Sequence, residues 1–370
     1  EKPDIGTFMR EWLALYDSKS GERGIFNRQS AQVQAAKYER RDPNIQYGTN
    51  PCSEIILRPK QFCNLSEVVV RASDTTETLK NKIELATILG TIQSCFTDLK
   101  GLSKQWTRNT EEERLLGVSL TGIMDNMMMS NKTDDDLAVV LDKLRLHAVA
   151  VNKKWAKKLD IEASTAITCV KPSGTVSQLV DASSGIHPRH NTYYIRTIRA
   201  DKKDPLTQFL IDQGFPHEDA SEKPDSTVVF SFPIAAPEGA ITRKDMTAID
   251  HLKLWKIYAD NWCEHKPSIT VSVKEDEWLG IANFVYEHFY SMSGISFLPM
   301  TEHTYKQAPY QDVSKEQWND ALLSMPNEVD WESFASYETE DRTTGSQEFA
   351  CTANSCEIVD FPTPISVVAQ

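Results

Sequence analysis

The sequence lacks the marks of several large classes of protein. No stretch approaches the roughly 18 uninterrupted apolar residues that a membrane-spanning helix needs, and no signal peptide stands at the start. Dense runs of lysine and arginine are absent as well, and the formal net charge over 370 residues is −13. That acidic balance argues against non-specific binding to nucleic acid or to an anionic membrane surface. We therefore expect neither nucleic acid nor a membrane among the partners.

Cysteine is scarce and loosely spaced. The seven cysteines are an odd number, and they do not form the dense pattern of a secreted, disulfide-stapled domain. We infer a reducing, cytoplasmic setting, in which paired cysteines are catalytic or bind a metal. A zinc site at Cys52 and Cys63 would need a CxxC pair or a nearby pair of histidines, and neither is present. Cys95, Cys169 and Cys263 fall within helix-like or strand-like runs, and we expect them in the core.

Composition and element order predict the fold class. Hydrophobic residues make up 40% of the chain and charged residues 25%, as in a soluble globular protein long enough for one large α/β domain or two average ones. Short apolar runs predict strands at 68–70, 166–170, 227–232, 269–273 and 294–299. Helices are expected at 7–18, 205–213, 245–263 and 275–291. The alternation favours an α/β protein with a mostly parallel sheet, open or closed.

Three further helices are expected between residues 74 and 158. The four residues from Asp74 resemble a capping box and predict a helix to about residue 97, with an apolar face made of Leu79, Ile83, Leu85, Ile88, Leu89 and Ile92. Thr110 and the three glutamates after it predict a second helix that continues through Leu115, Val118, Ile123 and Met124. Thr133 with three aspartates predicts a third, long helix to about Lys158.

The stretch with the most chemistry is Asn50-Pro51-Cys52-Ser53-Glu54, followed by Cys63. The proline fixes its own φ and favours extended geometry in the residue before it, and in an extended segment residues i, i+2 and i+4 share a face. We therefore expect Asn50, Cys52 and Glu54 to point towards one substrate, with Cys63 brought back by a short turning link. A buried cysteine beside an ordinary turn is the alternative, which the gathering of four such groups makes the weaker interpretation.

Two polar loops follow the strand expected at 166–170. Ser173, Gly174, Thr175 and Val176 would present free backbone N–H groups at the start of a helix, which suits a phosphate. The Gly-Lys-Ser/Thr of a Walker loop is absent, and an ordinary helix cap would look similar. Further on, small residues at Ser184 and Gly185, near His187, would let a large ligand approach the backbone; a plain polar loop is the alternative.

From about residue 337 the composition is dominated by Glu, Asp, Thr, Ser and Gly, which is typical of a mobile tail. Cys351 and Cys356 stand in this tail, five positions apart. A mobile dithiol suits exchange with another disulfide more than structural stapling, and an incidental pair of cysteines is the alternative.

Taken together, these motifs resemble ribonucleotide reductases. Asn-Pro-Cys-Ser-Glu at 50–54, with Cys63-Asn64-Leu65 eleven residues after Cys52, is similar to the finger loop of that family. The likeness extends over nearly the whole chain, through the segments 21–27, 172–177, 183–188, 296–299 and 307–310. Within the family, the chain most resembles the adenosylcobalamin-dependent, monomeric ribonucleoside-triphosphate reductases of class II.

The resemblance implies a fold and a division of the chain. The family's fold is a ten-stranded α/β barrel of two half-barrels, with the finger loop, here about 48–63, threaded through its middle. Residues 1–336 would be the C-terminal part of the catalytic barrel, and residues 337–370 would be the flexible redox tail. The chain begins at Glu1 in what reads as the middle of a domain. We therefore expect the N-terminal half to be missing, along with the cysteine that pairs with Cys63, and the chain alone to be inactive.

The resemblance also implies a mechanism for reducing ribonucleotides to 2′-deoxyribonucleotides. Adenosylcobalamin would generate a thiyl radical on Cys52, and this radical would remove the 3′ hydrogen of the substrate. Glu54 would act as general base on the 3′-hydroxyl, and Asn50 would hold the substrate. Cys63 and its partner would end as a disulfide, which the tail dithiol would reduce by exchange before a thioredoxin-like protein reduced the tail. Residues 173–176 would bind the substrate phosphates.

Three other interpretations stay open. The finger-loop motif is shared with the diiron class I enzymes, whose radical arrives along a tyrosine relay. Tyr193-Tyr194 is the one tyrosine pair available, and it follows 186–188 too closely to be the expected relay pair, which favours class II. A non-radical dithiol oxidoreductase would use Cys52 and Cys63. A non-catalytic module would be a degenerate half-enzyme, which the intact finger-loop residues argue against.

Overall fold

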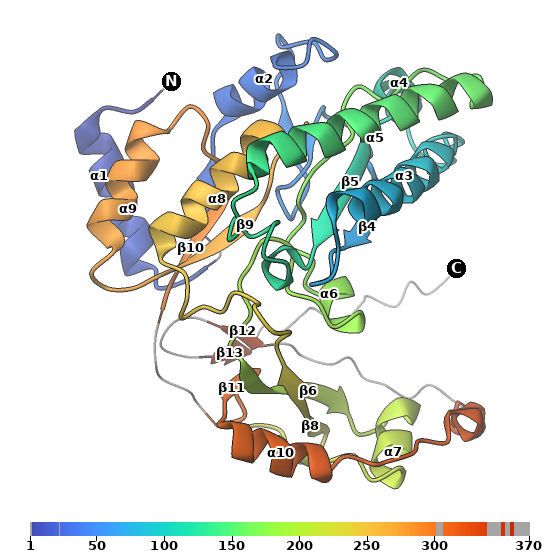
Figure 1. Cartoon of the computed structure of the whole chain (residues 1–370), viewed down its shortest axis with the longest axis vertical. Coiled ribbons are helices and arrows are strands. Elements are labelled where there is room, and N and C mark those ends of the chain that lie inside the picture. Colours follow the sequence, from blue (N-terminus) through green and yellow to red (C-terminus); the bar gives the residue numbers. More distant parts are fainter. Residues whose placement is uncertain (1, 22, 301–305, 339–348, 352–355, 359–370) are drawn as a thin grey trace, which may run out of the picture. The chain divides into compact units, whose positions relative to one another are not determined.

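The computed structural model of the chain (Figure 1) describes residues 2–21, 23–300, 306–338, 349–351 and 356–358, the last two ranges by their backbone alone. The chain divides into two compact units. The large unit comprises Glu1–Arg189 and Pro237–Met300, and the small unit comprises His190–Ala236 and Thr301–Gln370. The chain thus leaves the large unit after Arg189 and returns to it at Pro237.

The core of the large unit is a mostly parallel sheet, as the order of elements predicts. Its strands are β1 (Gly24–Phe26), β4 (Asn64–Val69), β5 (Leu116–Thr121), β9 (Ile269–Val273) and β10 (Ser293–Pro299). β4 pairs with β5 and β9 with β10, both in parallel, and β1 pairs antiparallel with β10. The strand expected at 166–170 joins the two parallel pairs, because Thr168 bridges Val118 and Val170 bridges Pro267. Among the described residues this sheet is open, with β4 and β1 at its edges.

Helices cover this sheet. They are α1 (Ile5–Asp17), α2 (Arg28–Ala36), α3 (Thr76–Gln93), α4 (Lys104–Glu113), α5 (Leu137–Leu159), α6 (Val176–Leu179), α8 (Ala248–Asn261) and α9 (Trp278–Glu287), with a 3₁₀ turn η1 at Ile123–Asp125. On one face, α5 packs against both α3 and α8 (Figure 1). The helices expected at 7–18, 245–263 and 275–291 and the long helix to Lys158 are confirmed, with ends shifted by a few residues. α3 begins with a capping box of Thr75 and Thr78, one residue later than the pattern predicted.

Buried aromatic side chains tie α8 to the sheet. Trp255 and Tyr258 are buried on the inner side of the helix, and Trp262 is buried at its C-terminal end. The indole N–H of Trp255 donates to Pro267 O at 2.9 Å, and that of Trp262 donates to Cys169 O at 2.8 Å. Each donor therefore has an acceptor where water cannot supply one. As a result, α8 holds both the strand at 166–170 and the entrance to β9.

One predicted helix, from Thr110 through Met124, is wrong. α4 ends at Glu113, and Arg114 adopts a left-handed conformation with φ of 40°. The following residues form β5, and all six of them are buried between β4 and the strand at 166–170. A strand that is covered on both faces loses its alternating pattern, so its sequence cannot be told from a buried helix by periodicity.

The apolar face predicted for α3 is only partly correct. Leu79 is fully buried, whereas Leu85 and Leu89 are 69% and 61% exposed. The inner face passes instead through Gly90, where an added Cβ would lie 3.3 Å from the side chain of Leu116. Close packing on β5 therefore selects small side chains at positions where hydrophobicity alone would place leucine.

The small unit is built on an antiparallel sheet, which the element order did not predict. In the order β11-β6-β8-β7, its strands are β11 (Tyr310–Asp312), β6 (Tyr193–Asp201), β8 (Thr227–Ala235) and β7 (His217–Asp219). It also contains α7 (Pro205–Asp212), α10 (Lys315–Leu323) and the 3₁₀ segment η2 (Trp331–Ser336). Phe209 of α7 packs against Trp331, Phe334 and Tyr337, so α7 and η2 share one aromatic cluster. The strand expected at 227–232 and the helix at 205–213 are confirmed.

A short hairpin contains the two cysteines of the predicted tail. β12 (Phe349–Cys351) pairs antiparallel with β13 (Cys356–Ile358), and Cys351 and Cys356 are directly opposed across the pair. The rest of the tail predicted from 337, namely residues 339–348, 352–355 and 359–370, lies outside the described residues.

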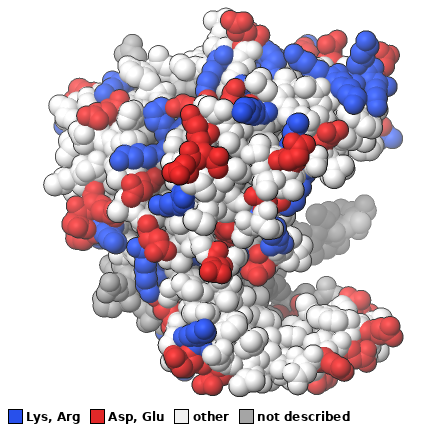
Figure 2. Space-filling model, in the orientation of Figure 1, with Lys and Arg blue, Asp and Glu red and all other residues white. Residues whose placement is uncertain are grey.

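Charged side chains of both signs are mixed over the face shown in Figure 2. Lysines gather at the C-terminal end of α5, where Lys157 and Lys158 occupy the last turn and complement the negative end of the helix dipole. Within the described part of the chain, no helix is both long enough and apolar enough to cross a membrane.

Candidate active site

The Asn50–Glu54 stretch forms the tip of a short hairpin. β2 (Gly48–Thr49) pairs antiparallel with β3 (Ile56–Leu57). Ser53 N donates to Asn50 O at 3.0 Å, which closes a β-turn with Pro51 and Cys52 at its two central positions. The extended geometry expected from the sequence is therefore wrong. Proline suits the first central position of a turn as well as an extended segment, and the closing hydrogen bond decides between them.

The turn puts the three predicted groups into different surroundings. Cys52 is exposed at the tip, whereas Glu54 is fully buried. Asn50 Oδ1 accepts a hydrogen bond from Ile55 N at 3.0 Å and so braces the turn from inside. Ser53 has a φ of 66°, a left-handed conformation that costs a non-glycine residue about 1 kcal/mol or more. Surrounding contacts must therefore hold Ser53 in place.

Lys171 connects Cys52 with Glu54. Its ammonium lies 3.4 Å from Glu54 Oε1 and also makes a hydrogen bond with the Cys52 side chain. Burial opposes the charge of Lys171, but the nearby Glu54 and Cys52 outweigh burial and raise the pKa of the lysine. The other carboxylate oxygen, Glu54 Oε2, is buried without a hydrogen-bond partner among the described residues. A buried acceptor with no partner, beside an exposed thiol, can receive a hydroxyl group of a ligand.

Cys63 lies one residue before β4 and is partly buried. Burial, reinforced by the negative charge of Glu54, raises the pKa of its thiol. Cys63 is therefore a protonated thiol at neutral pH. Cys169 and Cys263 are fully buried, as expected, whereas Cys95 is only half-buried.

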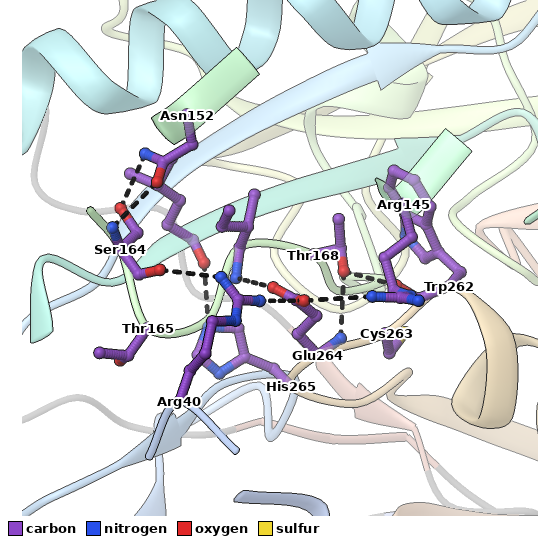
Figure 3. Close-up of polar contacts among 12 residues, drawn as sticks. Arg40, Arg145, Asn152, Ser164, Thr165, Thr168, Trp262, Cys263, Glu264 and His265 are labelled. Atoms are coloured by element: carbon purple, nitrogen blue, oxygen red, sulfur yellow. Dashed lines mark hydrogen bonds and ion pairs between the residues drawn. The ribbon is translucent and has the colours of Figure 1, made fainter. Parts of the chain in front are cut away.

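Glu264 is the centre of a buried polar network (Figure 3). This carboxylate is 2% exposed, and it forms ion pairs with Arg40 and Arg145. It also accepts a hydrogen bond from Ile167 N at 2.9 Å. Arg40 comes from the segment that precedes the hairpin, so Glu264 ties that segment to α5 and to the strand at 166–170.

The next two residues attach the hairpin itself. His265 donates from Nε2 to Leu116 O at 2.9 Å, while its Nδ1 accepts from Ile56 N at 3.3 Å, so the ring links β3 to β5. Lys266 N donates to Glu54 O at 3.2 Å. The Lys266 ammonium donates to Ser53 Oγ at 3.2 Å, and burial lowers the pKa of this lysine to about 7, against the opposing effect of Glu54.

Sequence reasoning missed Lys171 as a partner of Glu54, and it missed Glu264, His265 and Lys266 altogether. A signal for the last three was present in the sequence. They are three consecutive ionisable residues shortly before the strand predicted at 269–273. Charged groups in such a place need partners, because unpaired charges are rarely buried.

The turn proposed for phosphate follows Lys171 directly. Ser173 is buried with φ of 34°, whereas Gly174, Thr175 and Val176 are exposed. A Cβ added at Gly174 would meet no atom within 4 Å, so the turn is open on that side. α6, which begins at Val176, is a single helical turn. Residues 174–176 are therefore accessible, close in the chain to Lys171, which contacts Glu54 and Cys52 of the hairpin.

The loop from Ser184 to His187 packs beneath this turn. Ser184 Oγ donates to Ser173 O at 3.1 Å. Gly185 has φ of 54°, and an added Cβ would lie 2.3 Å from Lys171 O, so only glycine fits there. His187 Nδ1 contacts Ser184 O at 2.8 Å, and Nε2 accepts from Thr270 N at 3.0 Å, which assigns the proton to Nδ1. Burial lowers the pKa of His187, so the ring is a neutral support for the loop.

The large unit therefore brings together the hairpin, Cys63, the 173–176 turn and the 184–187 loop. The Cys351 and Cys356 hairpin belongs to the small unit, and its side chains are not described. Among the described residues, no three His, Cys, Asp or Glu side chains are grouped in a way that could hold a metal ion.

Comparison with known proteins finds relatives along most of the chain. No family model matches. The adenosylcobalamin-dependent ribonucleoside-triphosphate reductase of Euglena gracilis is 28% identical over 318 residues, which cover 84% of this chain and 42% of the relative. A probable enzyme of the same name from Dictyostelium discoideum is 29% identical over 320 residues, 84% of this chain and 40% of the relative. That of Lactobacillus gasseri is 29% identical over 304 residues, 74% of this chain and 40% of the relative. The chain spans less than half the length of these curated relatives.

Solved structures agree on the fold. A B12-dependent (class II) ribonucleotide reductase matches with a TM-score of 0.68 and 22% identity, over 80% of this chain and 44% of that one. The alpha subunit of the class Id ribonucleotide reductase of Actinobacillus ureae matches with a TM-score of 0.51 and 16% identity, over 79% of this chain and 61% of that one. The chain is thus an α/β protein that is similar in sequence and fold to ribonucleotide reductases, and in sequence to the adenosylcobalamin-dependent ribonucleoside-triphosphate reductases.

Proposed function

We propose that this chain carries the catalytic hairpin of an adenosylcobalamin-dependent ribonucleotide reductase, which converts ribonucleoside triphosphates to 2′-deoxyribonucleotides. The observation that carries the proposal is the pairing of an exposed thiol, Cys52, with a buried carboxylate, Glu54, whose Oε2 has no partner among the described residues. Hydrogen abstraction needs a reachable sulfur, and proton removal needs an acceptor that is free until the substrate arrives. The relatives named above carry this activity in their names.

The hairpin suits an external radical source. Cys52 stands at the tip of a turn and is exposed, so a bulky cofactor can come close to its sulfur. Adenosylcobalamin, when bound, supplies the radical that turns this thiol into a thiyl, and the cobalt chemistry is the cofactor's own. The hairpin's part is to hold the sulfur at a fixed position and to limit the access of water to Glu54.

The roles of the side chains follow from their surroundings. The Cys52 thiyl takes the 3′ hydrogen of the ribose, and Glu54 Oε2 takes the proton of the 3′-hydroxyl. The amide nitrogen of Asn50 has no hydrogen bond within the described part of the chain, so it can donate to the substrate while Oδ1 braces the turn. Cys63, kept protonated by burial, gives a proton to the 2′-hydroxyl, which leaves as water. Cys63 and a second cysteine then give the substrate two electrons and the second proton, so that C2′ gains a hydrogen and the two thiols become a disulfide. The hydrogen held by Cys52 returns to C3′ and regenerates the thiyl.

Two further sites complete the proposal. The turn of buried Ser173 and exposed Gly174, Thr175 and Val176 receives the substrate phosphates on its exposed side, and Ser184, Gly185 and His187 support it from beneath. Cys351 and Cys356, opposed in the β12–β13 hairpin, form the dithiol that reduces the Cys63 disulfide. A thioredoxin-like protein then restores this dithiol in the cytoplasm.

The proposal also concerns the rest of the enzyme. The open sheet of the large unit would be the later half of a ten-stranded barrel, with residues 1–336 in the barrel and 337–370 as the redox tail. Because the relatives are more than twice as long as their match to this chain, the other half-barrel is a required partner. The chain by itself would then be inactive.

The test is complementation. The chain is mixed with, or fused to, the N-terminal part of a relative, and deoxynucleotide formation from ribonucleoside triphosphates is measured with adenosylcobalamin and dithiothreitol. We expect turnover only when both parts and the cofactor are present. Turnover without cobalamin would point to a diiron enzyme, and disulfide reduction by the chain without any ribonucleotide would point to a dithiol oxidoreductase. Either result would overturn the proposal.

A second arm of the test separates the two cysteine pairs. The double variant Cys351→Ser, Cys356→Ser should lose turnover with thioredoxin and keep it with dithiothreitol, because a small thiol can reach the Cys63 disulfide directly. Loss of turnover with both reductants would show that the tail does not act as a shuttle.

A further inference from the structure

The Asn50–Glu54 hairpin needs an anchor, because its turn is strained. Ser53 is held at a φ of 66°. Such a conformation persists in a non-glycine residue only when neighbouring contacts fix it. The hydrogen bond from Ser53 N to Asn50 O closes the turn, but it does not hold the turn against the rest of the large unit.

Lys266 makes the contacts that hold Ser53 against the rest of the large unit. Its ammonium donates to Ser53 Oγ at 3.2 Å and to Ser293 Oγ at 2.9 Å, and it lies 4.4 Å from the centre of the Phe26 ring. Its backbone N–H donates to Glu54 O at 3.2 Å. The residue is only 5% exposed. One buried lysine therefore clamps two consecutive residues of the hairpin onto β10 and β1.

Gly294 confirms how closely the hairpin packs against β10. It has φ of 74°, and an added Cβ would lie 2.9 Å from Ser53 O and 3.4 Å from the Lys266 side chain. No side chain can therefore enter between the turn and the strand. The position of the turn is set by the lysine and the glycine together.

We propose that Lys266 is the positioning residue of the Cys52 hairpin, holding Ser53 against Ser293 so that Cys52 and Glu54 keep fixed places. Lys266 contacts neither the Cys52 sulfur nor the free oxygen of Glu54 among the described contacts, so it acts through Ser53. The proposal rests on the proposed function only where it calls the hairpin catalytic. Its test uses this chain alone, without nucleotide or cofactor, so its failure is distinct from failure of the reductase proposal.

The charges around Lys266 predict a pH signature. From the hairpin Lys266 faces Ser53 and the Glu54 carboxylate, which also forms an ion pair with Lys171. From β10 it faces Ser293 and Gly294, from β1 the Phe26 ring, and its chain neighbour His265 is the other titratable group that interacts with it. Burial outweighs Glu54 and lowers the lysine's pKa to about 7. Opening the hairpin would return the lysine to water and restore its higher pKa, so above pH 7 opening takes up a proton. Raising the pH from 7 should therefore make opening rarer.

The experiment is amide hydrogen exchange over residues 50–56. In Lys266→Met, which keeps the bulk but removes the donors, exchange of the Ser53 and Ile55 amides should speed up about tenfold, the size expected for the loss of buried hydrogen bonds worth about 1 kcal/mol. Lys253→Met, an exposed lysine on α8, is the matched control and should leave these amides unchanged. In the wild type, protection corrected for intrinsic rates should rise between about pH 7 and pH 8.5, and Lys266→Met should lose that rise.

Two milder variants keep the test decisive if Lys266→Met does not fold. Ser53→Ala and Ser293→Ala should each speed exchange of the same amides by a smaller factor. Combining Ser53→Ala with Lys266→Met should add little to Lys266→Met alone, because both remove one interaction. Unchanged exchange in folded variants, additive effects, or an unaltered pH profile in Lys266→Met would each overturn the proposal.

Discussion

The two sides of Glu54 differ in burial and in what they can do. On one side, the half-exposed Lys171 contacts Glu54 Oε1 and the exposed Cys52. On the other side, the buried Lys266 and the residues before it fasten the hairpin to the sheet. The same side-chain type therefore has opposite pKa shifts, raised in Lys171 by Glu54 and Cys52 against burial, and lowered in Lys266 by burial. The open side is suited to chemistry, and the buried side is suited to holding position.

The largest effect should come from the buried side. Glu264→Ala removes the carboxylate that pairs with Arg40 and Arg145, so both arginines lose this partner. Breaking one partner of a buried ion pair costs about 3–5 kcal/mol. We expect a loss of that order in the free energy of unfolding, measured by urea titration. If the unfolding free energy fell by less than about 1 kcal/mol, the Glu264 network would contribute little to the stability of the large unit.

Next in size is the pH dependence caused by Lys266. Its folded pKa of about 7 lies below the ordinary lysine value of 10.5, so between these pH values the unfolded chain binds more protons and stability rises with pH. The rise from pH 7 to pH 10 should be about 3 kcal/mol. Urea titrations at several pH values should show it in the wild type and not in Lys266→Met. An equal rise in both proteins would assign it to other groups.

A smaller effect is expected where the hairpin meets β10. Gly294→Ala must place a Cβ at a φ of 74° and 2.9 Å from Ser53 O. Backbone strain and overpacking of this kind cost about 1–3 kcal/mol. Gly101→Ala, at a similar φ of 83° but in open space, is the matched control and should cost only the backbone part. Equal losses of stability would mean that the hairpin does not press on β10.

The smallest effect on stability belongs to the open side. Lys171→Met should change the free energy of unfolding by less than about 1 kcal/mol, because water screens a half-exposed ion pair. It should nevertheless slow alkylation of Cys52 by iodoacetamide severalfold, because the Cys52 side chain loses the ammonium group that forms a hydrogen bond with it. If Lys171→Met greatly lowered stability and left alkylation unchanged, Lys171 would hold the structure instead of acting on Cys52.

The fold was predictable from the sequence where a segment carries its own pattern. β9 matches its predicted range 269–273, because the alternation of Ile, Thr, Val, Ser and Val identifies a half-covered strand. β5 was missed because burial on both faces hides that alternation. The antiparallel sheet of the small unit was not recognised as separate, since pairing direction depends on contacts between distant segments.

In the candidate site, too, local features could be predicted from the sequence and contacts between distant residues could not. Cys52, Glu54 and Cys63 could be singled out because their residue types and spacing sit within one short stretch. The turn at Asn50 could not be, because proline is compatible with both geometries. Lys266 is 213 positions from Ser53 in the chain, and nothing local in the sequence signals that the two residues meet.

The central claim is that the Cys52 sulfur performs the hydrogen abstraction, and Cys52→Ser tests it most directly. The substitution is at an exposed position, so the unfolding free energy should stay within about 0.5 kcal/mol of the wild type. In the enzyme completed with the N-terminal part of a relative, and with adenosylcobalamin and excess dithiothreitol, we predict no deoxynucleotide formation from the variant while the wild type turns over. Turnover by a folded Cys52→Ser variant would contradict the account.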